Sequence, residues 1–264
     1  MEQSGQKYSP EQFAARLGAD GDPKLNAAAD FCARLLNSDL GNRVGRVILF
    51  GSVAGSMARP ESDVDVMVFI AAPKPSRMEY AAQAAWETTV RWGELVSPLT
   101  YPLNQLFQPR SYVVYNALKR GREIYCMDEN EMRRIETLAL FNKARRHLED
   151  AQLVADTGVY TLAVVGAYSA AELAAKALLL LKPGVAMPYT HGGIVQIFSR
   201  EYIKTGEVPS SWGRMLNEKL QIRSESLYDP ESATTSEDAY YAIKFEGEIL
   251  TFLETKLMTV ERAA

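Results

Sequence analysis

Residues 47–54, VILFGSVA, and residues 62–66, SDVDV, decide the fold of the N-terminal half of this 264-residue chain. The first stretch is typical of a short buried strand that ends in Gly-Ser, and the second of a strand that begins with two carboxylates, Asp63 and Asp65. Side chains alternate along a strand, so both carboxylates are expected on the same face. The pattern therefore predicts a paired acidic site beside a glycine-containing turn.

These residue types suit a metal-bound triphosphate. Paired carboxylates bind a hard cation such as Mg²⁺, which shares its shell with substrate phosphates. Gly51 lets the backbone approach a phosphate closely, and Ser52 can donate from its hydroxyl and its backbone N–H. We therefore expect Gly51, Ser52 and Ser62 against the phosphates. Asp63 and Asp65 would bind the metal and serve as catalytic carboxylates in an in-line displacement at phosphorus.

A simpler interpretation is that Asp-x-Asp caps a strand and Gly-Ser is an ordinary turn. The combination of the two favours the functional interpretation, and the same residues resemble the signature of the DNA polymerase β-like nucleotidyltransferases, above all the minimal type. That signature is Gly-Ser, a small residue, a spacer and then Ser-Asp-x-Asp. The resemblance covers about residues 25–125 and implies Mg²⁺ as cofactor and ATP as nucleotide donor. The arginine that often follows in this family is absent, because Ala54 precedes Gly55-Ser56.

The resemblance also implies a third carboxylate on a later strand, and here two alignments remain open. Alignment to some antibiotic adenylyltransferases makes Glu94 the third catalytic acid. Alignment to the minimal enzymes places Ser97 at that position, which leaves one metal ligand missing and the activity in doubt.

Strands and helices are expected to alternate up to about residue 128, with helices alone beyond it. Strands are predicted over 46–50, 63–70, 95–101 and 123–125, and helices over 23–37, 76–92 and 110–120. Pro98 indicates an edge position or a bulge in the third strand. Further helices are predicted near 130–156, 159–182, 192–204, 211–228 and 234–259. The fold class is therefore α+β: an N-terminal extension (1–24), a nucleotidyltransferase-fold domain (25–128) with a small mixed sheet, and an all-α bundle (129–264).

The helical half resembles a HEPN domain. The resemblance rests on the helix that contains Glu172 and Lys176, on the helix start at Thr190-His191, and on Arg223 followed by Tyr228. Without it, Glu172 and Lys176 are most simply a surface pair, and His191 a capping or packing residue. Arg223 could equally be a partner of the helix dipole or an anion ligand.

Many HEPN ribonucleases carry a histidine where this chain has Tyr228. Tyrosine has a high ordinary pKa and is a poor general base at neutral pH. The resemblance therefore implies a non-nucleolytic domain used for binding, dimerisation or substrate positioning, with a homodimer through the bundle as one expectation. Arg223 and Tyr228 would form a structural or anion-binding pair, and the less favoured alternative makes the Tyr228 hydroxyl an acceptor of AMP.

Composition limits the cellular setting. The formal net charge of −4 gives no sign of a strongly basic nucleic-acid binder. Two cysteines form no disulfide framework. The most apolar stretch, residues 162–181, contains Glu172 and Lys176, which argues against a membrane span. We expect a cytoplasmic protein with no membrane partner.

The sequence is compatible with three candidate functions. The first is Mg²⁺-dependent transfer of a nucleoside monophosphate, AMP from ATP, to a hydroxyl of a protein, an RNA or a small molecule. The second is an aminoglycoside- or lincosamide-type antibiotic adenylyltransferase, in which the bundle helps to enclose the acceptor. The third is a catalytically weak, nucleotide-binding module of the toxin–antitoxin kind with an RNA or protein partner.

Overall fold

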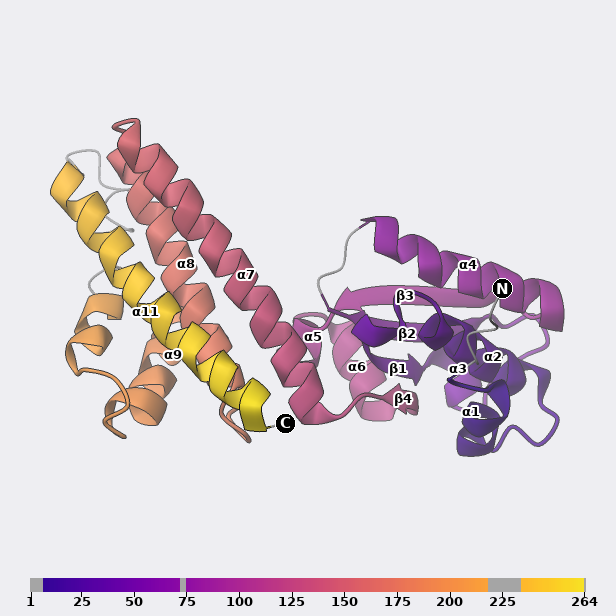
Figure 1. The fold of residues 1–264 in the computed structure, drawn as a ribbon. Coiled ribbons are helices and arrows are strands. Elements are labelled where there is room, and N and C mark those ends of the chain that lie inside the picture. Colours follow the sequence, from indigo (N-terminus) through magenta and orange to yellow (C-terminus); the bar gives the residue numbers. More distant parts are fainter. Residues whose placement is uncertain (1–6, 72–74, 218–233, 264) are drawn as a thin grey trace. The chain divides into compact units, whose positions relative to one another are not determined.

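The computed structural model describes residues 7–71, 75–217 and 234–263, which form two compact units, Met1–Ile135 and Glu136–Ala264 (Figure 1). The dividing point lies inside helix α7 (Glu129–Asp156), slightly beyond the boundary expected at residue 128. The first unit contains a sheet with helices, and the second is helical. The predicted α+β class is confirmed.

The sheet of the first unit is mixed. Its strands are β1 (Val44–Leu49), β2 (Val64–Ile70), β3 (Val96–Pro102) and β4 (Arg122–Cys126), in the order β3-β2-β1-β4. β1 pairs antiparallel with both β2 and β4, and β3 pairs parallel with β2. Pro98 lies in β3 at the edge of the sheet, as the sequence predicts. A proline, which lacks an N–H, is tolerated there because one side of an edge strand has no neighbouring strand to bond.

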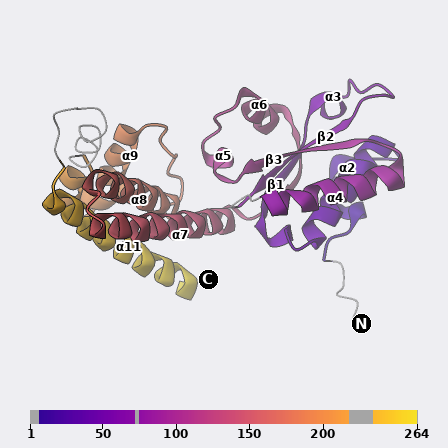
Figure 2. The same cartoon turned by 90° about the horizontal axis from the view of Figure 1, so that it is seen from above.

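Helices cover both faces of this sheet (Figure 2). Val47 and Val66 point into one core, formed with α1 (Pro10–Leu17), α2 (Pro23–Asn37) and α4 (Pro75–Trp92). Ile48 and Phe69 point the other way, against α6 (Tyr112–Arg120). The short helices α3 (Gly51–Ala54) and α5 (Asn104–Phe107) complete the unit. The alternation along β1 thus gives each face of the sheet its own core.

Helix α1 lies in the stretch that the sequence analysis assigned to an N-terminal extension. Its apolar residues Phe13 and Leu17 are buried in the core with α2. Pro10 stands at the first helical position, and Gly18 ends the helix in the left-handed conformation with φ 59°. These are ordinary start and stop signals, so this helix could have been found from the sequence.

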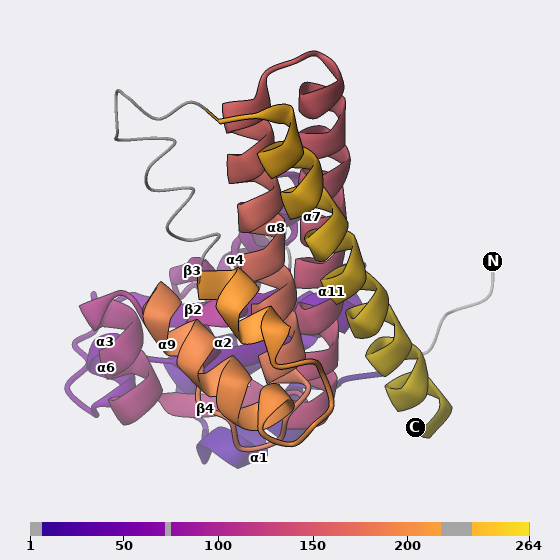
Figure 3. The ribbon, with the colours of Figure 1, turned by 90° about the vertical axis from the view of Figure 1, so that its left-hand side faces the viewer.

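The second unit is a helical bundle in which α7 and α8 (Tyr160–Leu180) pack with α11 (Ser236–Ala263) (Figure 3). Helix α9 (His191–Phe198) continues into the single π-turn η2 (Ser199–Ile203). Buried alanines of α8 allow close helix approach. Among the described helices α8 alone is long and apolar enough to span a membrane, and most of it is buried inside the bundle, as in the core helix of a soluble protein.

Two glutamates are buried in the bundle. Glu246 of α11 is 0% exposed, and both of its carboxyl oxygens lack a hydrogen-bond partner within the described structure. Burial raises the pKa of Glu246 well above its ordinary value and raises the pKa of Glu136 to about 7. Both side chains are therefore neutral at mildly acidic pH in the folded protein.

We expect the bundle to lose stability as the pH rises. A carboxyl with a raised folded pKa binds its proton more tightly in the folded state, so its contribution is complete below the ordinary value of 4.5 and is lost as the pH rises through the folded pKa. For Glu136 this window runs from about 4.5 to about 7. Urea unfolding between pH 4 and 8 measures the slope. Glu246→Gln should flatten it, and an unchanged slope in that variant would exclude Glu246 as its source.

Candidate active site

Gly51 stands where strand β1 has ended and helix α3 begins. Its φ is +74°, a conformation that favours glycine, and a Cβ at this position would collide with the Oδ2 atom of Asp65. The backbone N–H of Phe50 donates to the carbonyl of Asp65 at 3.0 Å. The Gly-Ser turn is therefore held directly against the second carboxylate, and only glycine allows so close an approach.

Asp63 and Asp65 flank the fully buried Val64, whose side chain packs in the core between the sheet and α2. Asp65 points to the face opposite to Val64, and Asp63 directly precedes β2, close enough for its charge to act on Asp65; Asp63 is exposed and Asp65 half-buried. Burial, and then the charge of Asp63, raise the pKa of Asp65. Two negatively charged carboxylates that lie close together beside the Gly51 turn fit a divalent cation such as Mg²⁺, which takes oxygen ligands.

The strand register places Ser97 beside Asp65. The alignment that puts serine at the third acidic position is thus the one that the sheet supports. No group of three or more His, Cys, Asp or Glu side chains comes together as a metal site in the part of the chain that the structure describes. At this point the site departs from the full three-carboxylate pattern.

Glu94, the third acid in one of the two alignments, forms an ion pair with a lysine. Its carboxylate pairs with the Lys24 ammonium at 2.5 Å, because it precedes β3 and faces the start of α2. The ammonium also donates to the backbone carbonyls of Pro60 at 3.0 Å and Ser62 at 2.7 Å. The structure therefore does not bring Glu94 together with Asp63 and Asp65; it ties Glu94 to the loop that leads into them.

Lys24→Met is expected to destabilise the protein by about 2 kcal/mol, because Glu94 and two carbonyls lose their partner at a largely buried point. The loop before Asp63 should also become more mobile. Urea unfolding measures the first effect, and amide hydrogen exchange of residues 59–63 the second. Lys119→Met, on an exposed side chain, is the matched control. Unchanged exchange in Lys24→Met would show that the ion pair does not hold this loop.

The two serines differ in their surroundings. The Ser62 hydroxyl accepts a hydrogen bond from the backbone N–H of Arg59 at 2.9 Å and so shapes the loop before Asp63. Ser52 lies in the first turn of α3, where its half-buried hydroxyl has no hydrogen-bond partner among the described residues. The Ser52 hydroxyl is thus free for a phosphate, and the O–H of Ser62, whose oxygen only accepts here, can still donate to one.

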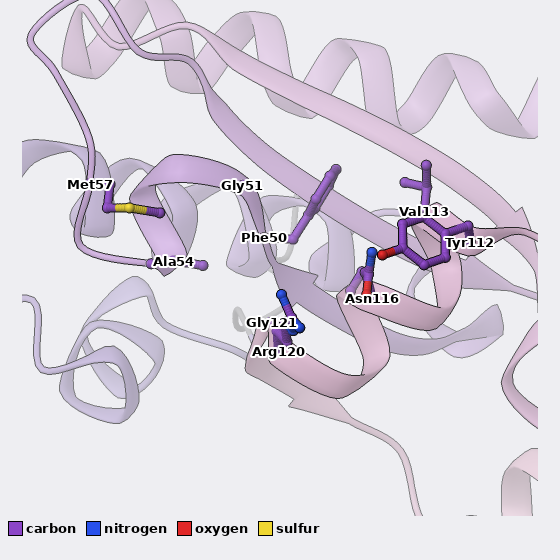
Figure 4. A pocket seen from close by; sticks show the side chains of 11 residues that line it. Phe50, Gly51, Ala54, Met57, Tyr112, Val113, Asn116, Arg120 and Gly121 are labelled. Atoms are coloured by element: carbon purple, nitrogen blue, oxygen red, sulfur yellow. The ribbon is translucent and has the colours of Figure 1, made fainter.

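A cavity of about 390 Å³ begins at Gly51. It lies between α3 with its following loop and helix α6, and Figure 4 shows Phe50 at its centre, with Met57 on one side and Tyr112 and Asn116 on the other. Sequence reasoning missed these lining residues, because α6 carries no motif that marks it as part of a site.

In the bundle, residues that the sequence analysis treated separately come together. The Glu172 carboxylate pairs with Lys176 at 2.5 Å and with Nδ1 of His191 at 2.5 Å. The Tyr168 hydroxyl lies 3.5 Å from the same ring nitrogen. Thr190 caps α9 by accepting from the N–H of Gly193 at 3.1 Å. The predicted pair Arg223 and Tyr228 lies outside the described residues.

Comparison with known families finds one match in each of the two compact units. Residues 35–130 match the family described as polymerase beta, nucleotidyltransferase, and residues 137–256 match the HEPN domain family. The chain belongs to the proteins that join these two domains. Both resemblances drawn from the sequence are thereby confirmed, and the site around Gly51 and Asp65 lies within the nucleotidyltransferase domain.

Two relatives come from Methanocaldococcus jannaschii. The protein named "Putative toxin MJ0142" is 31% identical over 104 residues, which are 39% of this chain and 69% of the relative. The protein named "Putative toxin MJ0605" is 29% identical over 116 residues, which are 44% of this chain and 84% of the relative.

Proposed function

We propose that this nucleotidyltransferase–HEPN protein transfers AMP from ATP to a hydroxyl group in a Mg²⁺-dependent reaction. The observation that carries the proposal is the close approach of Gly51 to the Asp65 carboxylate, because it supports a phosphate site at this turn beside a carboxylate pair. Asp63 and Asp65 would hold Mg²⁺, and the free Ser52 hydroxyl and the backbone of Gly51 would hold the phosphates.

In this reaction the acceptor oxygen attacks the α-phosphorus, a new P–O bond forms, and the bond to pyrophosphate breaks. Mg²⁺, when bound, neutralises charge on the phosphates. Asp65, the more buried carboxylate, would take the proton of the acceptor hydroxyl, and the missing side chain of Gly51 leaves room for its carboxylate. The backbone N–H groups of the Gly51-Ser52 turn would orient the phosphates for in-line attack.

A second candidate is a nucleotide-binding module with little catalysis that acts with a toxin–antitoxin type of partner. Ser97 beside Asp65 favours it, because the third acid of the full pattern is absent from that register position. The names of the two relatives, each a putative toxin, support the toxin–antitoxin part of this candidate. The antibiotic-type alternative loses support, since it drew on Glu94 as third acid and that residue pairs with Lys24.

Ser97→Asp tests whether the missing third acid limits transfer. The substitution places a carboxylate next to Asp65 on the neighbouring strand, so transfer should rise by roughly tenfold, which corresponds to about 1.4 kcal/mol of transition-state stabilisation. Leu99→Asp adds the same charge to an exposed position further along β3 and should leave the rate unchanged. If Ser97→Asp gives no more transfer than Leu99→Asp, a missing third acid is not what limits the reaction.

The direct test uses ATP labelled with ³²P at either the α or the γ position, incubated with Mg²⁺, the purified protein and, in turn, cell proteins, RNA and a panel of aminoglycosides and lincosamides. The α label should appear on an acceptor and the γ label should not. Label from the γ position would identify a kinase, and no transfer from either position would leave the nucleotide-binding module as the better account.

A further inference from the structure

The cavity beside Gly51 adjoins the proposed catalytic carboxylates. Gly51 both lines the cavity and touches the Asp65 carboxylate, so a molecule bound here would lie next to a phosphate held at the turn. Its volume of about 390 Å³ lies in the range of small-molecule sites. The cavity is thus placed to hold the part of a substrate that continues from the phosphates.

Helix α6 is fixed against the end of β1 at Gly121. A Cβ there would collide with the side chain of Ile48 and lie 2.5 Å from the carbonyl oxygen of Ala117 and 2.9 Å from that of Leu49. Only glycine therefore allows this approach, and the preceding Arg120 lines the same cavity as Gly51.

The charge of the lining selects an anion. Arg120 is the one charged side chain among the lining residues, and its exposed guanidinium has no ion pair within the described structure. No carboxylate lines the cavity, whereas a polycationic aminoglycoside would need several. A phosphate-bearing ligand therefore suits this cavity better than a cationic acceptor.

The remaining lining suits a flat aromatic ligand. Tyr112 is 76% exposed and Met57 is 74% exposed, although both carry large apolar surfaces. Together with Phe50 and Val113 they frame the cavity (Figure 4). Aromatic rings of this kind stack on nucleobases. Asn116 adds an amide that can both donate to and accept from the edge of a base.

We propose that this cavity binds the nucleoside of the donor nucleotide, with the base stacked on Tyr112, its edge hydrogen-bonded to Asn116, and a phosphate oxygen paired with Arg120. This inference rests on the proposed function, because it places the triphosphate at Gly51 and Ser52. It adds that α6 recognises the base and that the acceptor enters from elsewhere.

Isothermal titration calorimetry with two probes tests the inference separately from the proposed function. Mg²⁺-tripolyphosphate reports on the phosphate site alone, and Mg²⁺-ATP on both sites. Tyr112→Ala should weaken binding of ATP at least tenfold and change binding of tripolyphosphate less than twofold. Tyr115→Ala removes a half-exposed tyrosine of the same helix that does not line the cavity, and should change neither.

Each outcome decides one of the two claims. If both probes bind, and Tyr112→Ala weakens ATP no more than tripolyphosphate, the nucleoside lies elsewhere and the phosphate site stands. If the parent protein binds neither probe, the proposed function fails and the inference falls with it. Asn116→Ala gives a second readout: the ratio of affinities for ATP, GTP, CTP and UTP should approach one, and an unchanged ratio would contradict a role for Asn116 in base recognition.

Discussion

Asp65→Asn is expected to lower the rate of AMP transfer by roughly a thousandfold, equivalent to about 4 kcal/mol of lost transition-state stabilisation. Asparagine keeps the size of the side chain but removes the charge that a divalent cation and the acceptor proton require. The effect should appear in kcat, with an accompanying loss of Mg²⁺-dependent ATP affinity.

The nearby exposed Glu61 provides the matched control. Glu61→Gln removes one negative charge from the loop before Asp63 without touching the carboxylate pair, so transfer should change less than twofold. Thermal unfolding of both variants shows whether the fold is intact. Parental transfer by a folded Asp65→Asn protein would place the chemistry somewhere other than the end of β2.

Gly51→Ala should have an effect of similar size for a different reason. The new Cβ would collide with Oδ2 of Asp65, and alanine is strained at a φ of +74°. Either the carboxylate or the turn must move, so both ATP binding and transfer should fall at least a hundredfold. The free energy of unfolding should fall by about 1–3 kcal/mol.

Gly158→Ala is the control for this variant. Gly158 lies in the turn after α7 with a φ of +82°, so alanine is strained there too, but an added Cβ would meet no atom within 4 Å. Steady-state kinetics of both variants, with circular dichroism to follow folding, make the comparison. Equal activity of Gly51→Ala and the parent would mean that the turn does not hold phosphate against Asp65.

Local pattern was sufficient to predict the paired carboxylates. Asp63 and Asp65 needed only the period of a strand, and Gly51 only its place at the end of β1. The third acidic position could not be settled in this way, because it depends on the register between β2 and β3. Register arises from tertiary pairing, and a shift of a few residues along β3 exchanges Glu94 for Ser97.

Longer-range features were invisible for the same reason. Lys24 and Glu94 form an ion pair although they are far apart in the sequence. The α6 residues and Gly51 line one cavity only after the chain has folded. In the bundle, the sequence alone suggests a surface residue for Glu172 and a helix cap or packing residue for His191. The packing of α9 against α8 brings the Glu172 carboxylate to 2.5 Å from Nδ1 of His191. Sequence spacing predicts neighbours on one element and not contacts between elements.

The central claim is that Mg²⁺ and the phosphates of ATP meet between the Gly51 turn and the two carboxylates. Anomalous diffraction from crystals grown with Mn²⁺ and a non-hydrolysable ATP analogue tests it most directly. We expect a manganese peak within coordination distance of Asp63 and Asp65, with the triphosphate against the Gly51-Ser52 turn. A nucleotide bound elsewhere in the chain, with no manganese at these carboxylates, would contradict it.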